Sequence, residues 1–195
     1  MNEMPRRTEA RGFTIIELLI VVMIVAIGVA LATPTYQDAI QKRHTESRSE
    51  RFASFVNHAQ SESIKRFQTV TVNVNWTAAK DWCVGAVEGE MACDCTGLDA
   101  DNLCVIDSET YVLASEAGFK SGLLDPGVAG NGVTFTFDPT RGIMSNANNS
   151  LGLDHAFVFR SDNAHFEATI DVLPTSRIAI CSSGNYPLTS YDACR

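Results

Sequence analysis

Cysteine is the residue type with the most distinctive chemistry in this sequence. The six cysteines all follow the apolar segment near the N-terminus: Cys83, Cys93, Cys95, Cys104, Cys181 and Cys194. An even number confined to one part of a chain fits disulfides formed in an oxidising compartment. Cys181 and Cys194 enclose twelve residues, so we expect them to pair and tie down the tail, contributing about 3 kcal/mol on the chain-entropy model. The other four allow three pairings. A bond between Cys93 and Cys95 would be strained, so we expect each to reach one of the two outer cysteines.

The loop that holds these four cysteines offers two alternatives to disulfides. A zinc site would have one residue between Cys93 and Cys95, whereas structural zinc sites favour two to four residues between paired ligands. A calcium site would use carboxylate oxygens, and the candidates are Asp94, Asp99, Asp101 and Asp107. Their order does not match an EF-hand loop. We therefore expect no metal and no other cofactor.

The sequence contains no motif that is typical of a catalytic site. The four histidines, which show no spacing typical of a metal or catalytic site, are His44, His58, His155 and His165. The sequence contains no G-x-S-x-G, H-E-x-x-H or P-loop motif. We predict that the protein is not an enzyme.

Glu17 is the one charged residue in an apolar run of 21 residues, 13–33. This run is long enough to span a bilayer as a helix, and Arg6, Arg7 and Arg11 before it predict that this end stays in the cytoplasm. Burying a carboxylate in the run costs roughly 2–3 kcal/mol. Neither a plain anchor nor a cleaved secretory signal explains that cost, although the side chain could snorkel to the lipid headgroups.

The residues around Glu17 supply a third interpretation. Residues 11–17, Arg-Gly-Phe-Thr-Ile-Ile-Glu, resemble the type IV prepilin (class III) signal, G-F-T-L-I-E. The resemblance implies that a prepilin peptidase removes the leader, 1–12, by cutting between Gly12 and Phe13, and that Phe13 is then N-methylated. Glu17 becomes the fifth residue of the mature chain. Its carboxylate would pair with the amino terminus of the same or a neighbouring subunit inside a filament, because a buried charge needs a partner.

A long helix must position these N-terminal residues. Pro34 follows the apolar run and can kink a helix without ending it. Beyond it the pattern becomes amphipathic, with one face formed by Tyr36, Ile40, Phe52, Phe55, Val56, Ala59, Ser63 and Phe67. The wet face carries Lys42, Arg43, Glu46, Arg48, Glu50, Arg51, Glu62, Lys65 and Arg66. We predict one helix from about Phe13 to about Phe67, with a transmembrane or filament-core half at 13–34 and an amphipathic half at 35–67.

Short strands dominate the rest of the chain, 68–195. The candidates are Thr69–Asn75, Trp82–Val87, Leu103–Ile106, Thr110–Ala114, Val133–Phe137, His155–Arg160, Phe166–Val172 and Arg177–Ser182. One helix followed by a run of strands predicts an α+β fold in which the helix packs on an antiparallel β-sheet.

Several segments of this domain resemble the GspH/FimT family. Residues 61–66, Ser-Glu-Ser-Ile-Lys-Arg, followed by Val-Thr-Val at 70–72, are similar to the R-S-E-A-I-K-R-G-Q-P-V-T-L segment of that family. Residues 135–142 resemble its F-x-P-x-G turn, and residues 177–181 stand where it has its last strand. Phe67 occupies a position where the family often has glycine, so we expect the helix to run on slightly. The resemblance implies a type IV pilin-like fold and a structural role.

The charge of the C-terminal part limits its partners. From Gln68 onward there are sixteen acidic and six basic residues, whereas nucleic-acid binding needs a basic footprint. Some FimT-type pilins bind DNA through arginines in a G-R-x-R motif near the last strand, where this chain has only Arg177 and Arg195. We expect at most weak, salt-sensitive contact with DNA.

The combined expectation is a minor pilin held in the inner membrane by one helix, with its domain in the periplasm. After processing, it would pack with other pilins and initiate or cap a type IV pilus. A minor pseudopilin of a type II secretion system and a DNA-binding minor pilin are the alternatives.

Overall fold

The computed structural model describes residues 13–76, 82–96, 103–115, 122–124, 132–145 and 154–194, without the side chains of 31–35 and 122–124. The chain forms two compact units, Met1–Ala39 and Ile40–Arg195. Helix α1, Ile15–Arg66, contributes to both units. The predicted long helix is therefore present.

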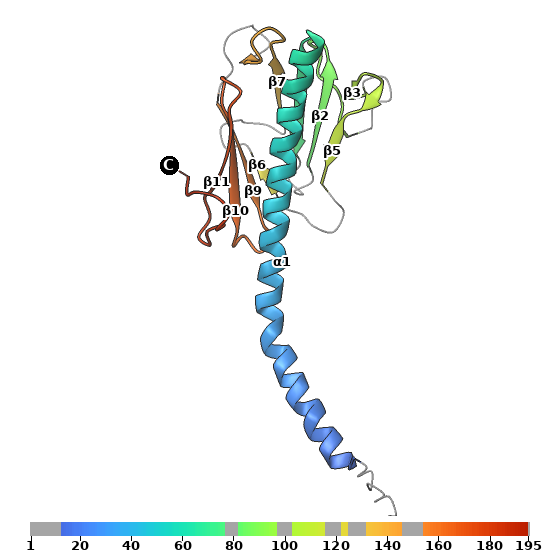
Figure 1. Cartoon of the computed structure of the whole chain (residues 1–195), viewed down its shortest axis with the longest axis vertical. Coiled ribbons are helices and arrows are strands. Elements are labelled where there is room, and N and C mark those ends of the chain that lie inside the picture. Colours follow the sequence, from blue (N-terminus) through green and yellow to red (C-terminus); the bar gives the residue numbers. More distant parts are fainter. Residues whose placement is uncertain are drawn as a thin grey trace, which may run out of the picture. The chain divides into compact units, whose positions relative to one another are not determined.

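The described strands of the second unit form two sheets and a small hairpin (Figure 1). The larger sheet has the order β5-β2-β1-β7-β8 and contains β1 (Val70–Trp76), β2 (Trp82–Glu88), β5 (Val112–Ala114), β7 (Gly132–Phe137) and β8 (Met144–Ser145). The smaller sheet has the order β11-β10-β9-β6 and contains β6 (Gly122–Leu124), β9 (His155–Arg160), β10 (Glu167–Val172) and β11 (Ile178–Ser182). The hairpin pairs β3 (Val105–Ile106) with β4 (Glu109–Thr110). Every pairing between named strands is antiparallel, for example Val70↔Glu88 and Val70↔Phe137. The predicted fold class is confirmed, except that the strands form more than one sheet.

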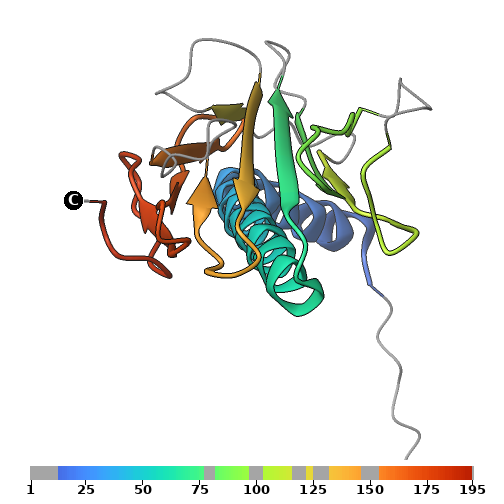
Figure 2. The same ribbon diagram turned by 90° about the horizontal axis from the view of Figure 1, so that it is seen from above.

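The core of the second unit lies between α1 and both sheets, and Figure 2 shows the strands curving around this part of the helix. Phe52 of α1 is fully buried. Its ring centroid lies 6.2 Å from that of Trp82 in the larger sheet and 4.9 Å from that of Phe157 in the smaller one. One helical side chain thus contacts both sheets. The apolar periodicity of α1 predicted that Phe52 faces the core, but not that two sheets meet there.

The helix ends at Arg66 and does not run on. The next residue, Phe67, adopts a φ of 54°. Its N–H donates to Ile64 O at 3.4 Å, and the Gln68 N–H donates to Ser63 O at 3.3 Å. This is the Schellman arrangement that usually places glycine in the left-handed position. The expected extension was wrong because Phe67 takes the backbone conformation that a glycine would take.

Two other expectations for the helix faces were wrong. Tyr36 and Phe67 were placed on the buried face, but their exposed fractions are 68% and 81%. Arg48 was placed on the wet face, but only 6% of it is exposed. Phe67 lies past the last turn of the helix, so the 3.6-residue period no longer fixes its direction.

Candidate processing and assembly site

The start of α1 carries a capping arrangement. The Glu17 N–H lies 3.3 Å from Thr14 Oγ1, and the Leu18 N–H donates to Thr14 O at 3.2 Å. Thr14 is therefore the N-cap residue and Glu17 the third helical residue, the spacing of a Thr-x-x-Glu capping box. A carboxylate in the first turn also complements the positive end of the helix dipole. A capping role for Thr14 was not predicted, although a Thr-x-x-Glu string before an apolar run is a known signal for a helix start.

The helix beyond this cap exposes its apolar side chains. From Ile15 to Val29, the large apolar side chains are 48–84% exposed in the single chain: Ile15, Ile16, Leu18, Leu19, Ile20, Val21, Val22, Met23, Ile24, Val25, Ile27 and Val29. An apolar surface of this length is not stable against water, so it needs a covering layer.

The predicted processing positions lie at the edge of the described chain. Gly12 falls outside the described residues, and Phe13 directly precedes the N-cap. The cut between them and the methylation of Phe13 stay predictions. Pro34 lies inside α1, and its side chain is outside the described residues, so the kink also stays a prediction.

Membrane insertion was predicted for the first half of the helix, 13–34. Among the described residues, no helix combines the length and the apolar character that a membrane crossing needs.

The structure brings the six cysteines together in three pairs. Cys181 is bonded to Cys194, the pairing expected from their spacing. Cys83 is bonded to Cys95, and Cys93 to Cys104. With all four loop cysteines in disulfides, their thiolates are not available to zinc. The described residues contain no cluster of three or more potential metal ligands, and Asp99 and Asp101 lie outside them.

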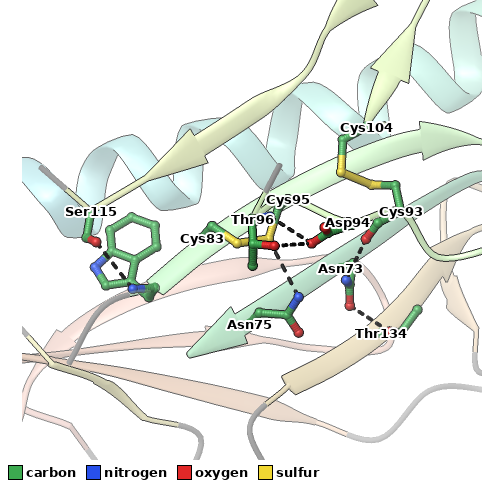
Figure 3. The surroundings of a disulfide bond; sticks show 11 residues. Asn73, Asn75, Cys83, Cys93, Asp94, Cys95, Thr96, Cys104, Ser115 and Thr134 are labelled. Carbon is green, nitrogen blue, oxygen red and sulfur yellow. Dashed lines mark hydrogen bonds between the residues drawn. A yellow bond between two sulfur atoms is a disulfide. The ribbon is translucent and has the colours of Figure 1, made fainter. Parts of the chain in front are cut away.

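The disulfide loop also contacts the larger sheet through polar groups (Figure 3). Asn73 of β1 donates from Nδ2 to Cys93 O at 2.7 Å and accepts from Thr134 Oγ1 of β7 at 2.9 Å. The loop is packed so closely that a Cβ atom on Gly85 of β2 would lie 2.1 Å from Cys104 Sγ. Glycine is therefore required at this position of the strand.

A charged cluster joins the end of α1 to this loop region. The Arg66 guanidinium lies 2.9 Å from Glu62, 2.9 Å from Asp107 and 3.5 Å from Glu88. Its hydrogen bonds hold the pKa of Asp107 and the pKa of Glu62 below their ordinary values, and they raise the pKa of Arg66. Arg66, Glu62 and Asp107 therefore stay charged at neutral pH, and their ion pairs hold the end of α1 against this region.

A second polar contact lies one turn away. The Tyr111 hydroxyl bonds to His58 Nδ1, and the other ring nitrogen of His58 lies 3.7 Å from Glu62 Oε1. Burial raises the pKa of Tyr111 to about 12, so this hydroxyl keeps its proton at neutral pH.

Of the two arginines considered for DNA contact, the structure describes only Arg177. Arg177 is exposed in the turn before β11, where its carbonyl accepts from the Leu173 N–H at 3.0 Å. Arg195 lies outside the described residues. A DNA contact here stays a prediction.

Comparison with known proteins identifies the class. The prokaryotic N-terminal methylation motif matches residues 7–33, and the family described as "Type II transport protein GspH" matches residues 48–176. Among solved structures, the chain is similar to the crystal structure of the type IV minor pilin FimU of Pseudomonas aeruginosa, with a TM-score of 0.47, 12% identity, and coverage of 71% of this chain and 88% of that one. A search of the curated proteins finds no match.

A methylation motif followed by a long helix that packs on antiparallel strands defines a type IV pilin-like protein. The chain belongs to the GspH family, whose match covers residues 48–176.

Proposed function

We propose that this protein is a prepilin that is cut between Gly12 and Phe13, N-methylated on Phe13 and held in the inner membrane by α1. Its C-terminal domain lies in the periplasm, and the processed chain joins other pilins as a minor subunit that initiates or caps a type IV pilus. Prepilin peptidase and the neighbouring pilins are its partners. This is a structural role without catalysis.

The single observation that supports the proposal best is the exposed apolar half of α1 with one carboxylate at its start. Lipid or the helices of other subunits would cover the apolar side chains. The Glu17 carboxylate would then need a cation, and the new amino terminus at Phe13 lies four residues away in the same or a neighbouring chain. A mispositioned subunit would bury this charge without a partner, so the pair favours correct registration in the filament.

Mass spectrometry of the native protein tests the processing step. In cells with an active prepilin peptidase, the mature chain is expected to begin at Phe13 with one added methyl group. A chain that still begins at Met1 in those cells would refute the proposal.

The family description favours a second candidate, a minor pseudopilin of a type II secretion system. Deletion of the gene separates the two roles. Loss of surface filaments with normal protein secretion supports the pilus, and loss of secretion with normal filaments supports the pseudopilin.

A further inference from the structure

The tail of the domain contains a loop without charged residues, 182–190. Its sequence is Ser-Ser-Gly-Asn-Tyr-Pro-Leu-Thr-Ser. It belongs to a part of the chain that carries sixteen acidic and six basic residues from Gln68 onward. Leu188 is fully buried, whereas Tyr186 is 52% exposed. The loop is therefore fixed in the fold by one side chain and presents an aromatic ring to its surroundings.

The Tyr186 ring is held in place by the turn between β9 and β10. Its centroid lies 4.8 Å from that of His165 and 6.1 Å from that of Phe166, which is buried. The Tyr186 N–H also donates to His165 O at 3.4 Å. A side chain that is already held in one orientation loses little conformational entropy when a partner covers it. Tyrosine, with its apolar body and polar tip, is enriched at membrane–water interfaces.

The loop and the turn both contact the start of the second unit. Lys42 Nζ donates to Thr189 Oγ1 at 2.7 Å, and the Asp162 N–H donates to Gln41 Oε1 at 3.4 Å. The second unit begins at Ile40. The loop and the turn therefore lie at the end of the unit that follows, along the chain, directly after the apolar part of α1.

The chain between the apolar run and this end of the unit is short. The run ends at Thr33, and Gln41 is eight residues further on. Eight residues cannot span more than about 28 Å even when fully extended. With the apolar run in the membrane, as proposed above, the loop stays within reach of the bilayer surface whatever the arrangement of the two units. Such a tether also raises the effective concentration of the loop at that surface.

The charges at this end of the unit do not oppose contact with a bilayer. The segments that contact one another here are 41–46, 161–166 and 182–190. With histidine counted as neutral, they contain two basic and two acidic residues: Lys42, Arg43, Glu46 and Asp162. Anionic lipid headgroups attract basic residues near a membrane surface and repel acidic ones. A balanced end on an acidic domain is therefore the end that such a surface repels least.

We propose that the loop 182–190, with Tyr186 at its exposed position, rests on the lipid headgroups of the membrane that holds α1. The contact orients the domain of a single subunit before that subunit joins a filament. The inference rests on the proposed anchoring of α1 and goes beyond it, because an anchor by itself does not set the orientation of the domain.

Photo-cross-linking of the full chain in lipid vesicles tests this contact. The vesicles contain phosphatidylethanolamine and phosphatidylglycerol at a high lipid-to-protein ratio, so that most of them hold a single chain. The photoreactive residue p-benzoylphenylalanine replaces Tyr186, and mass spectrometry identifies the peptides that carry a lipid.

Position 67 is the matched control for exposure. Phe67 is also aromatic and is more exposed, at 81%, so that non-specific contact with lipid would favour it over Tyr186. It lies roughly 39 Å from Gln41 along α1, at 1.5 Å per residue. Because a ring so far from the surface does not touch lipid, we expect position 186 to give lipid links at a yield at least about tenfold above position 67.

Two charge variants test the contact independently, and both are made in the chain that carries the photoreactive residue at position 186. Asn185 and Gln68 are both exposed. Asn185→Glu places a carboxylate beside the ring and is expected to lower the yield of lipid links about fivefold, the effect of one charge near an anionic surface. Gln68→Glu adds the same charge at the other end of the unit and is expected to leave the yield unchanged. Far-UV circular dichroism checks that both variants are folded.

Position 23 separates this inference from the proposed function, because Met23 lies in the apolar part of α1 and is 64% exposed. Lipid links from position 23 with none from position 186 would overturn only the headgroup contact. An absence of lipid links from position 23 would refute the anchor, and with it the inference. Links from position 186 to a second copy in place of lipid, equal yields from position 67, or equal effects of the two charge variants would also overturn the contact.

Discussion

Glu17 has one role that the structure shows at the start of α1 and a second role that we propose. Its backbone N–H belongs to the cap that Thr14 provides, at 3.3 Å from the hydroxyl oxygen. Its carboxylate is the charge that we propose to pair with the mature amino terminus. The first role stabilises one helix, and the second concerns the assembly. Substitutions can separate them, because glutamine keeps the capping pattern but removes the charge.

We predict that Glu17→Gln and Glu17→Ala chains are inserted in the membrane but recruited into filaments at least about tenfold less, because a lost buried ion pair costs more than about 1.4 kcal/mol. Quantitative immunoblotting of sheared filaments against membranes measures recruitment. Thr14→Ala is the control, since it removes the cap and keeps the carboxylate, and it is expected to assemble nearly normally. Normal recruitment of Glu17→Gln would contradict the role given to the charge.

Asp107 gives a prediction about pH. Its ion pair with Arg66 lowers its pKa below the ordinary value of 3.8. The stabilisation from such a group is fully present above its unfolded pKa and is lost as the pH falls through its folded pKa. We expect Asp107→Asn to lower the urea midpoint at pH 7 and to have little effect at pH 2. Asparagine tolerates the φ of 53° at this position.

The neighbouring variant Glu109→Gln controls for loss of charge in the same hairpin, where Glu109 is exposed. Its urea midpoint at pH 7 is expected to stay near that of the parent chain. Equal shifts for the two variants would show that net charge, and not the Arg66 pair, determines the effect.

At the scale of elements, the residue that follows α1, Phe67, has a Cβ atom and lies in the left-handed backbone region. We predict that Phe67→Gly raises the free energy of unfolding by about 1 kcal/mol, because glycine removes the left-handed strain. Chemical denaturation of the full chain in micelles measures it. Phe67→Ala keeps the Cβ atom and loses only the ring, so its stability should stay close to that of the parent. A loss of stability in Phe67→Gly would mean that the ring has a structural role within the chain.

Strand β2 depends on the absence of a side chain at Gly85. The new Cβ atom of Gly85→Ala would overlap Cys104 Sγ, so we predict that the Cys93–Cys104 bond fails to form in much of the protein. Titration of free thiols after unfolding is expected to give about two per chain, compared with none in the parent. Gly28→Ala is the matched control, since no atom lies within 4 Å of its new Cβ. An intact Cys93–Cys104 disulfide in Gly85→Ala would show that the loop can move away from the new Cβ atom.

The elements differ in how well the sequence predicts them. Period-two alternation at 69–75 and the apolar period of α1 were strong enough to reveal β1 and the helix. Strands β6 and β8 have three and two residues, too few to show a period, and they were missed. The disulfide partners of Cys93 and Cys95 depend on how the loop folds over β2. Spacing in the sequence therefore could not decide which of them pairs with Cys83 and which with Cys104. The exposure of Phe67 was missed because it follows from one backbone dihedral.

At the scale of the whole second unit, the tail joins the smaller sheet to the helix. Within the loop closed by Cys181 and Cys194, Lys42 Nζ donates to Thr189 Oγ1 at 2.7 Å, and Ser190 Oγ donates to Glu46 Oε1 at 2.9 Å. Burial and the nearby Glu50 raise the pKa of Tyr191, so its hydroxyl remains a donor to Glu50. The tail is thus part of the packing around α1.

We predict that replacing both Cys181 and Cys194 by serine lowers the free energy of unfolding by about 3 kcal/mol, the value for a loop of this length on the chain-entropy model. Urea denaturation of the full chain in micelles measures the change. The single exchange Thr189→Ala removes one tail contact and is expected to cost no more than about 1 kcal/mol. A double serine variant as stable as the parent would contradict the role given to the tail.

The order of the loop disulfides has a consequence for how this protein is made. Cys83 leaves the ribosome first and is followed by Cys93, Cys95 and Cys104, yet the bonds join the first to the third and the second to the fourth. An oxidase that joined thiols in order of arrival would link Cys83 to Cys93 and leave Cys95 for Cys104. Native protein then requires either delayed oxidation until the loop has folded over β2 or a disulfide isomerase that exchanges the wrong pairs. The yield of this protein should therefore depend on the isomerase activity of the cell that produces it.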